Sequence, residues 1–250
     1  MAWPDPRTTR DAGIGMSRAP VGSVPQTDAA YDAGLRSYML KVYNYMASGV
    51  LLTGIVAMLF ANSGMAADIM LGGGPLNWLI SLSPLAIVFA MSFGQNKFST
   101  ATLQAMFWGF AGLMGLSMST IFLVYTGTSI AQTFFVTAVA FLGLSLYGYT
   151  TKKDLSGWGT FLIMGVIGLL VAMVVNIFLK STLFQLAISA IGVLIFAGLT
   201  AYDTQRIKSM YAYVAGTDMV GKVVIMSALN LYLDFINMFQ FLLMFMGNRE

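Results

Sequence analysis

Long apolar runs separated by short polar breaks dominate the chain from residue 42 onward. Each run is close to or above the roughly 20 residues that a helix needs to cross a bilayer. Barrel strands would be about half as long and would alternate apolar with polar positions. The pattern therefore predicts an all-α polytopic membrane protein, a seven-transmembrane-helix bundle in one domain. The expected spans are residues 42–62, 76–94, 102–125, 129–150, 158–179, 182–205 and 223–247.

The breaks between these runs carry turn residues, as in GGGP (72–75), and the longest break covers residues 206–222. Residues 1–35 are rich in Pro, Gly, Ala, Arg and Asp and lack the apolar core of a signal peptide. We expect residues 1–35 to form a disordered cytoplasmic tail and residues 36–250 to form the seven-helix transmembrane domain.

Composition supports this class and excludes others. Hydrophobic residues make up 58% of the 250 residues and charged residues only 9%, whereas soluble domains carry about 25% charged residues. The lipid bilayer is therefore the expected partner, and a net charge of +3 does not suggest nucleic acid. The chain contains no Cys and no His, which excludes thiol nucleophiles, His proton relays and zinc or haem held by those residues. We expect no cofactor and no enzymatic activity.

Basic residues gather on one side of the predicted bundle. All of the 13 Lys and Arg residues except Lys180 and Arg249 lie in the tail, at the first helix, or in loops on the same side as the tail. Cytoplasmic loops of membrane proteins carry such an excess. The N-terminus is therefore expected in the cytoplasm and, with seven helices, the C-terminus on the opposite side.

Two carboxylates, Asp203 and Asp234, fall within or at the edge of apolar runs, unlike the other eight acidic residues. An ionisable group inside a membrane helix costs roughly 3 kcal/mol on insertion scales and is by default a candidate functional residue. On an ideal helix each Asp belongs to a polar stripe within an arc of about 80°. The stripe of the last helix contains Ser227, Asn230, Asp234 and Asn237, and that of the sixth contains Gln185, Ser189, Gly192, Thr200 and Asp203.

Polar stripes turn away from lipid, so the simplest arrangement points Asp203 and Asp234 at each other. No Lys or Arg lies in the apolar interior of a helix to neutralise such a pair. Two close carboxylates in a low dielectric share a proton, and after deprotonation they repel and offer oxygen ligands to a hard cation such as Ca²⁺. In the alternative interpretation each Asp only sets helix register, with Asp203 paired to Arg206 three positions along.

Three segments carry a resemblance to a known family: GLTAYDTQRIK (198–208), ALNLYLDFINMF (228–239) and SLYGYTTKKDLSGWG (145–159). They resemble the two signature stretches and the fourth-to-fifth helix connection of the transmembrane Bax inhibitor motif family, in its bacterial branch. The resemblance implies a seven-helix bundle with the last helix central, in the bacterial cytoplasmic (inner) membrane. It also implies a pH-sensitive calcium leak gated by an aspartate pair that matches Asp203 and Asp234, which would ligate the transported calcium transiently.

The second helix departs from the pattern of some relatives, which carry a basic cluster with an Arg that pairs with the two aspartates. Here the matching end reads AMSFGQNKFST (90–100), and Lys97 is its only basic residue. An ammonium group lacks the bidentate fork of an arginine, so Lys97 would replace it only loosely.

Two other functions are also compatible with the sequence. One is an interaction protein that regulates a membrane protease or another membrane protein in a stress or cell-death pathway, recognising its partner through residues 1–35 or 206–222. The other is an intramembrane aspartyl protease, which Tyr202 and Asp203 would suit. Such proteases have Gly before the second Asp so that a substrate backbone can approach, whereas Leu233 precedes Asp234 here.

Overall fold

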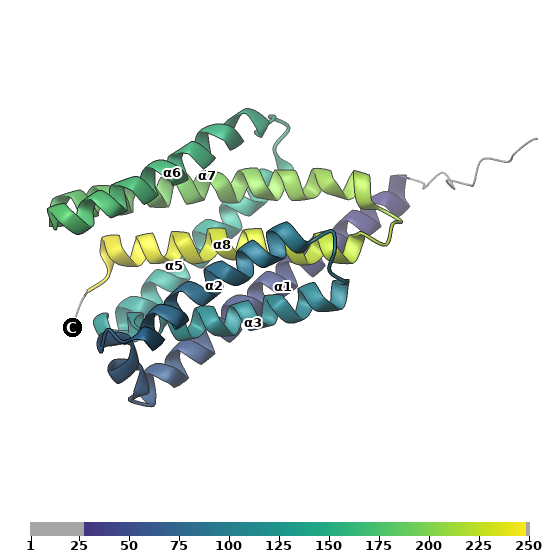
Figure 1. Ribbon diagram of the computed structural model, residues 1–250. Coiled ribbons are helices and arrows are strands. Elements are labelled where there is room, and N and C mark those ends of the chain that lie inside the picture. Colours follow the sequence, from purple (N-terminus) through teal and green to yellow (C-terminus); the bar gives the residue numbers. More distant parts are fainter. Residues whose placement is uncertain (1–27, 249–250) are drawn as a thin grey trace, which may run out of the picture.

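The computed structural model describes residues 28–248, and these residues form helices joined by short connections (Figure 1). Seven of the described helical segments are long and apolar enough to cross a membrane, with α3 and α4 making up one of them. The predicted all-α, seven-span architecture is therefore confirmed. The elements are α1 (Asp28–Asn62), η1 (Ala67–Leu71, one π-helical turn), α2 (Pro75–Gly94), α3 (Thr100–Met118), α4 (Ile121–Val124), α5 (Gly127–Thr150), α6 (Ser156–Leu179), α7 (Thr182–Val214) and α8 (Val220–Met246).

Two helices extend beyond the predicted spans. Helix α1 already begins at Asp28, so residues 28–35 are helical and do not belong to a disordered tail. The reason is burial, because the Tyr31 ring packs 5.2 Å from the Tyr211 ring and Leu35 is in the core. Helix α7 continues to Val214, where a loop from residue 206 was expected, because Ile207 and Tyr211 keep its buried face going. The rest of the proposed tail, residues 1–27, lies outside the described residues.

Helix starts follow ordinary capping chemistry. The side-chain oxygens of Ser99, Thr126 and Ser181 accept hydrogen bonds from backbone N–H groups in the first turns of α3, α5 and α7. Before α6, the carboxylate of Asp154 accepts from the N–H of Ser156 at 2.9 Å, and hydrogen bonding to Ser156 lowers the pKa of this exposed group. These caps explain why the connections stay short.

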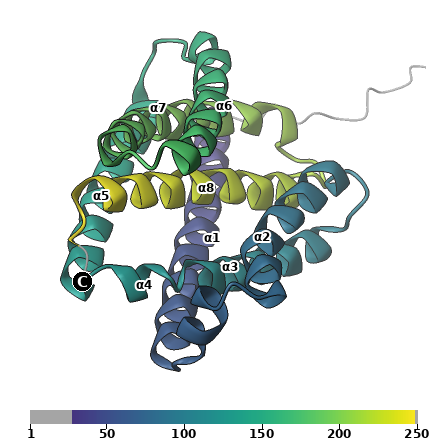
Figure 2. The ribbon, with the colours of Figure 1, turned by 60° about the vertical axis from the view of Figure 1, so that its left-hand side comes forward.

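Helix α8 lies at the centre of the bundle, between α6 and α7 on one side and α1, α2 and α3 on the other (Figures 1 and 2). It packs against α1, α3, α5 and α7. Over half (56%) of its membrane span is buried, against 11–33% in the other six spans. The central position of the last helix is confirmed, and over half of the side chains in its span are therefore held inside the protein.

Helix α6 is the least buried of the seven spans. It packs mainly against α7, and only 11% of its span is buried although its hydropathy, 2.8, is the highest of the seven spans. Such a helix presents most of its surface to lipid. It stands on the outer side of α7 and leaves a cavity between itself, α7 and α8.

Candidate functional site

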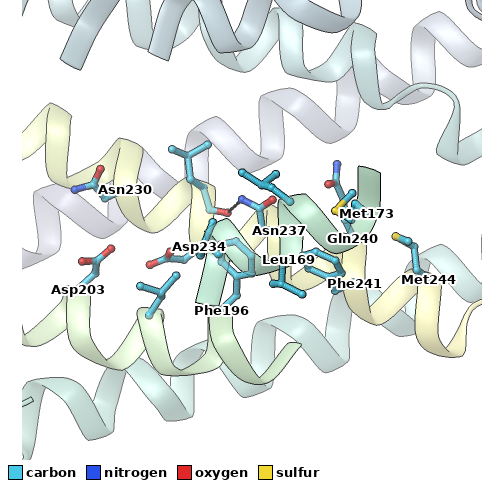
Figure 3. Close-up of a pocket in the computed structure, with 14 residues that line it drawn as sticks. Leu169, Met173, Phe196, Asp203, Asn230, Asp234, Asn237, Gln240, Phe241 and Met244 are labelled. Atoms are coloured by element: carbon cyan, nitrogen blue, oxygen red, sulfur yellow. Dashed lines mark hydrogen bonds between the residues drawn. The ribbon is translucent and has the colours of Figure 1, made fainter. Parts of the chain in front are cut away.

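Asp203 of α7 and Asp234 of α8 point toward each other across the interface of their helices (Figure 3). The two carboxyl groups are close enough for the charge of each to affect the other. Asp234 is only 4% exposed, whereas Asp203 is half-buried. The Oδ2 atom of Asp234 is buried and has no hydrogen-bond partner among the residues that the structure describes. A buried carboxylate oxygen without a partner is costly, so this oxygen is available to a proton or a cation.

The pair lines a cavity of about 440 Å³ between α6, α7 and α8. One wall is polar and comes from α8, which contributes Asn230, Asp234, Asn237 and Gln240. The facing wall is apolar and comes from α6, and α7 adds Asp203 beside apolar side chains. The apolar lining residues of α6 and α7 are Val166, Leu169, Leu170, Met173, Phe196 and Leu199.

The structure brings some members of the predicted polar stripes to this cavity and places others elsewhere. Asn230 and Asn237 line it, and the Nδ2 group of Asn237 donates to the Leu233 carbonyl at 2.8 Å (Figure 3). Ser227 lies outside it, with its hydroxyl 3.4 Å from the Tyr38 hydroxyl of α1. Thr200 is fully buried and donates to the Phe196 carbonyl of its own helix, so it also does not reach the cavity.

The two predicted basic neighbours differ in position. Arg206 is exposed one turn beyond Asp203 and attracts it electrostatically. Lys97 is exposed in the turn after α2 and does not line the cavity. Among the described side chains that line the cavity, none is basic. Of these two residues, only Arg206 therefore offsets the negative charge of the carboxylates, and it does so from one side.

Sequence reasoning missed two features of the site. Gln240 lines the cavity three residues beyond Asn237, and extending the α8 stripe by one turn would have found it. The Tyr232 hydroxyl lies 2.6 Å from the Thr53 hydroxyl of α1, which donates to the Ala111 carbonyl of α3 at 2.8 Å. No sequence signal pairs these three positions, because the link depends on how α1 and α3 pack around α8.

Leu233, directly before Asp234, lines the cavity with its side chain. Intramembrane aspartyl proteases need Gly at this place for the close approach of a substrate backbone. The leucine side chain fills that space, so the site does not have the open backbone of the protease motif.

A buried and a half-buried carboxylate that face each other in a bundle of seven spans define this chain as a polytopic membrane protein with titratable groups between its helices. The chain belongs to the family described as "Inhibitor of apoptosis-promoting Bax1", whose model matches residues 35–250. It is 44% identical over 230 residues to "Inner membrane protein YbhL" of Escherichia coli strain K12, covering 90% of this chain and 98% of the relative.

Two further relatives extend the similarity to other bacteria. A Rickettsia prowazekii protein is 51% identical over 223 residues, with coverage of 88% of this chain and 93% of the relative. A Caulobacter vibrioides protein is 46% identical over 248 residues, with coverage of 94% and 99%. These matches span nearly the whole membrane domain, so the family assignment applies to the entire bundle and includes both aspartates.

Proposed function

We propose that this protein is a pH-sensitive leak pathway for cations, with Ca²⁺ as the transported ion and the Asp203–Asp234 pair as its gate. The observation that carries the proposal is the Oδ2 atom of Asp234, which has no hydrogen-bond partner among the described residues. Asp234 is only 4% exposed, and together with the carboxyl group of Asp203 it lines a cavity of about 440 Å³. A divalent cation at this place would neutralise two charges that otherwise repel.

The oxygen chemistry of the cavity suits a hard cation that stays briefly. Ca²⁺ takes six to eight oxygen ligands, and the cavity offers two carboxylates and the amide oxygens of Asn230 and Asn237. Within the described residues, no cluster of three or more acidic, His or Cys side chains could hold a metal firmly. Water would complete the shell, and the binding would be weak enough for release, as conduction requires.

The direction of the pH response follows from the charge of the pair. When one proton is shared, a carboxyl–carboxylate hydrogen bond holds α7 and α8 together and the pair carries one negative charge. When that proton leaves, the two charges repel and attract a divalent cation. Flux should therefore rise as the pH rises and fall as the pair is protonated.

Calcium flux into proteoliposomes that contain a trapped indicator, measured over a series of pH values, tests the proposal. Asp234→Asn should remove the pH-dependent flux, because a neutral amide neither releases a proton nor attracts Ca²⁺. Asp218→Asn is the matched control, since Asp218 is exposed in the turn between α7 and α8. Flux and pH response in Asp234→Asn equal to those of the unaltered protein would eliminate the proposed gate.

We also propose the bacterial inner membrane as the location, with the N-terminus in the cytoplasm. The name of the Escherichia coli relative supports the membrane, and the one-sided distribution of Lys and Arg supports the orientation. A reporter fused to each terminus in turn would test the orientation, and activity of a periplasmic reporter at the N-terminus would contradict it.

A further inference from the structure

A second cavity of about 400 Å³ lies at the end of the bundle where α6 passes into α7. Its lining includes Asn176, Lys180 and Gln185, which give this end a polar surface. Met173 of α6 and Met244 of α8 line both this cavity and the one that contains the aspartate pair. The two cavities therefore adjoin at these methionines and form one groove along α8.

The α8 wall of the groove has polar groups that the protein leaves unpaired. The side-chain amides of Asn230 and Gln240 make no hydrogen bond to another residue within the described part of the chain. An unpaired amide in hydrocarbon costs several kcal/mol. If lipid chains filled the groove, both amides would be left unpaired in hydrocarbon, and so would the Oδ2 atom of Asp234. Water would satisfy all three groups.

The opposite wall explains how such a groove can stay open. Helix α6 packs mainly on α7, and the side chains that it contributes to the cavity of the aspartate pair, Met173 included, are all apolar. Its short connection to α7 places Lys180, in the left-handed conformation with φ 49°, at the outer cavity. From Asp234 to Met244 is ten residues, or about 15 Å of helix. The groove thus covers the depth from the middle of α8 to one end of the bundle.

We propose that this groove between α6 and α8 is the water-filled access route to Asp234, entered from the end of the bundle that carries Lys180. Met173 and Met244 form the apolar junction on the route, and Lys180 at the mouth opposes the approach of cations. With the orientation proposed above, the mouth faces away from the cytoplasm. The inference rests on the proposed function for what travels along the route, but the existence of the route can be tested without any flux.

The absence of Cys from the sequence makes a direct test simple. Single cysteines are introduced as Gln185→Cys at the mouth, Gln240→Cys and Asn237→Cys along the route, and Leu229→Cys on the closely packed side of α8, where Leu229 is 1% exposed. Val139→Cys, at a residue 72% exposed in the middle of α5, reports the lipid-facing surface. A cationic, membrane-impermeant thiol reagent is added to vesicles of each orientation. The fraction of protein that carries the reagent is then measured by mass spectrometry over time.

The route requires Gln185→Cys, Gln240→Cys and Asn237→Cys to react from the Lys180 end, in that order of rate, while Leu229→Cys and Val139→Cys stay unlabelled. Adding Met244→Trp should slow the reaction at Asn237→Cys and leave that at Gln185→Cys unchanged. Failure of both Gln240→Cys and Asn237→Cys to react from either side would mean that lipid fills the groove. Their reaction from the other end only would place the access elsewhere, and either result overturns the inference.

Lys180 is tested in the same experiment with two reagents. In the Gln240→Cys background, Lys180→Gln should speed labelling by the cationic reagent about threefold relative to a neutral maleimide, as expected for one screened charge near the mouth. An unchanged ratio would remove Lys180 from the proposal. If the cysteines react as expected but Asp234→Asn keeps normal calcium flux, the proposed function is wrong and the route stands. If the flux depends on Asp234 as proposed but the cysteines do not react, the route is wrong and the proposed function stands.

Discussion

The hydroxyl of Tyr232 on α8 lies 2.6 Å from the hydroxyl of Thr53 on α1. Tyr232 is two residues before the buried Asp234 in the sequence. Thr53 has one hydroxyl hydrogen and donates it to the Ala111 carbonyl of α3, so Tyr232 must be the donor to Thr53. Tyr232 is fully buried, and its ring also meets Phe107 and Phe110 of α3. This link holds α8 against α1 and α3 on the side opposite the cavity, and thereby positions Asp234.

Tyr232→Phe removes the hydroxyl and keeps the ring. We expect a loss of about 1 kcal/mol of stability, the usual contribution of one hydrogen bond inside a membrane bundle. Thr53→Val breaks both bonds of the chain of hydroxyls and should cost more. The midpoint of thermal unfolding in detergent measures each variant. Because the variants share one interaction, the double variant should lose less than the two single losses added together, and strict additivity would show that the hydroxyls are not coupled.

Gly148 marks a close approach of α5 to the backbone of α7. A Cβ atom there would overlap the carbonyl oxygen of Ala201, which is backbone and cannot swing away. Gly148→Ala should therefore destabilise the protein by about 1–3 kcal/mol, as overpacking does. Gly143→Ala, on the same helix, is the matched control because its Cβ would have no neighbour within 4 Å. Equal unfolding midpoints for the two variants would contradict the close crossing.

Arg206 provides the positive charge that attracts Asp203. Arg206→Gln removes this attraction and therefore favours the protonated form of the aspartate pair. The pair then loses its proton only at a higher pH. If the pair gates flux, the midpoint of its pH dependence should move to higher pH. Lys152→Gln removes an exposed charge from the loop before α6 and should leave the midpoint in place. Calcium flux in proteoliposomes between pH 5 and 9 gives both midpoints, and a downward or absent shift in Arg206→Gln would disprove this role.

Gln205 of α7 holds the connection between α5 and α6. Its Nε2 group donates to the Lys153 carbonyl, and its Oε1 atom accepts from the Leu155 N–H, both at 2.8 Å. Gln205→Ala removes both bonds, so the loop should open more often and trypsin should cleave after Lys152 and Lys153 several times faster.

Gel analysis of tryptic fragments from inside-out vesicles gives the cleavage rate. Ser209→Ala serves as the control, since the Ser209 hydroxyl donates to the Arg206 carbonyl of its own helix and not to the loop. Cleavage of Gln205→Ala at the rate of the control would mean that these bonds do not hold the loop. Faster cleavage in right-side-out vesicles would contradict the proposed orientation.

The sequence alone determines most of the fold. Run length and composition demand seven membrane spans, because a bilayer accepts only segments of that length and polarity. The same reasoning finds Asp203 and Asp234, since an uncompensated carboxylate in an apolar run is rare, and helical periodicity places Asn230 and Asn237 on the face of Asp234. Helix ends were less well determined, as the burial of Leu35 and Ile207 extended α1 and α7 into expected polar segments.

Only the tertiary structure decided what surrounds the aspartates. Helix α6 is apolar on nearly all sides, so its periodicity does not say which face turns toward α8 or that a cavity separates the two helices. The Tyr232–Thr53 link and the diversion of Ser227 to Tyr38 arise from residues 179 and 189 positions apart. Such contacts depend on how whole helices pack around α8, which a pattern along a single helix does not contain.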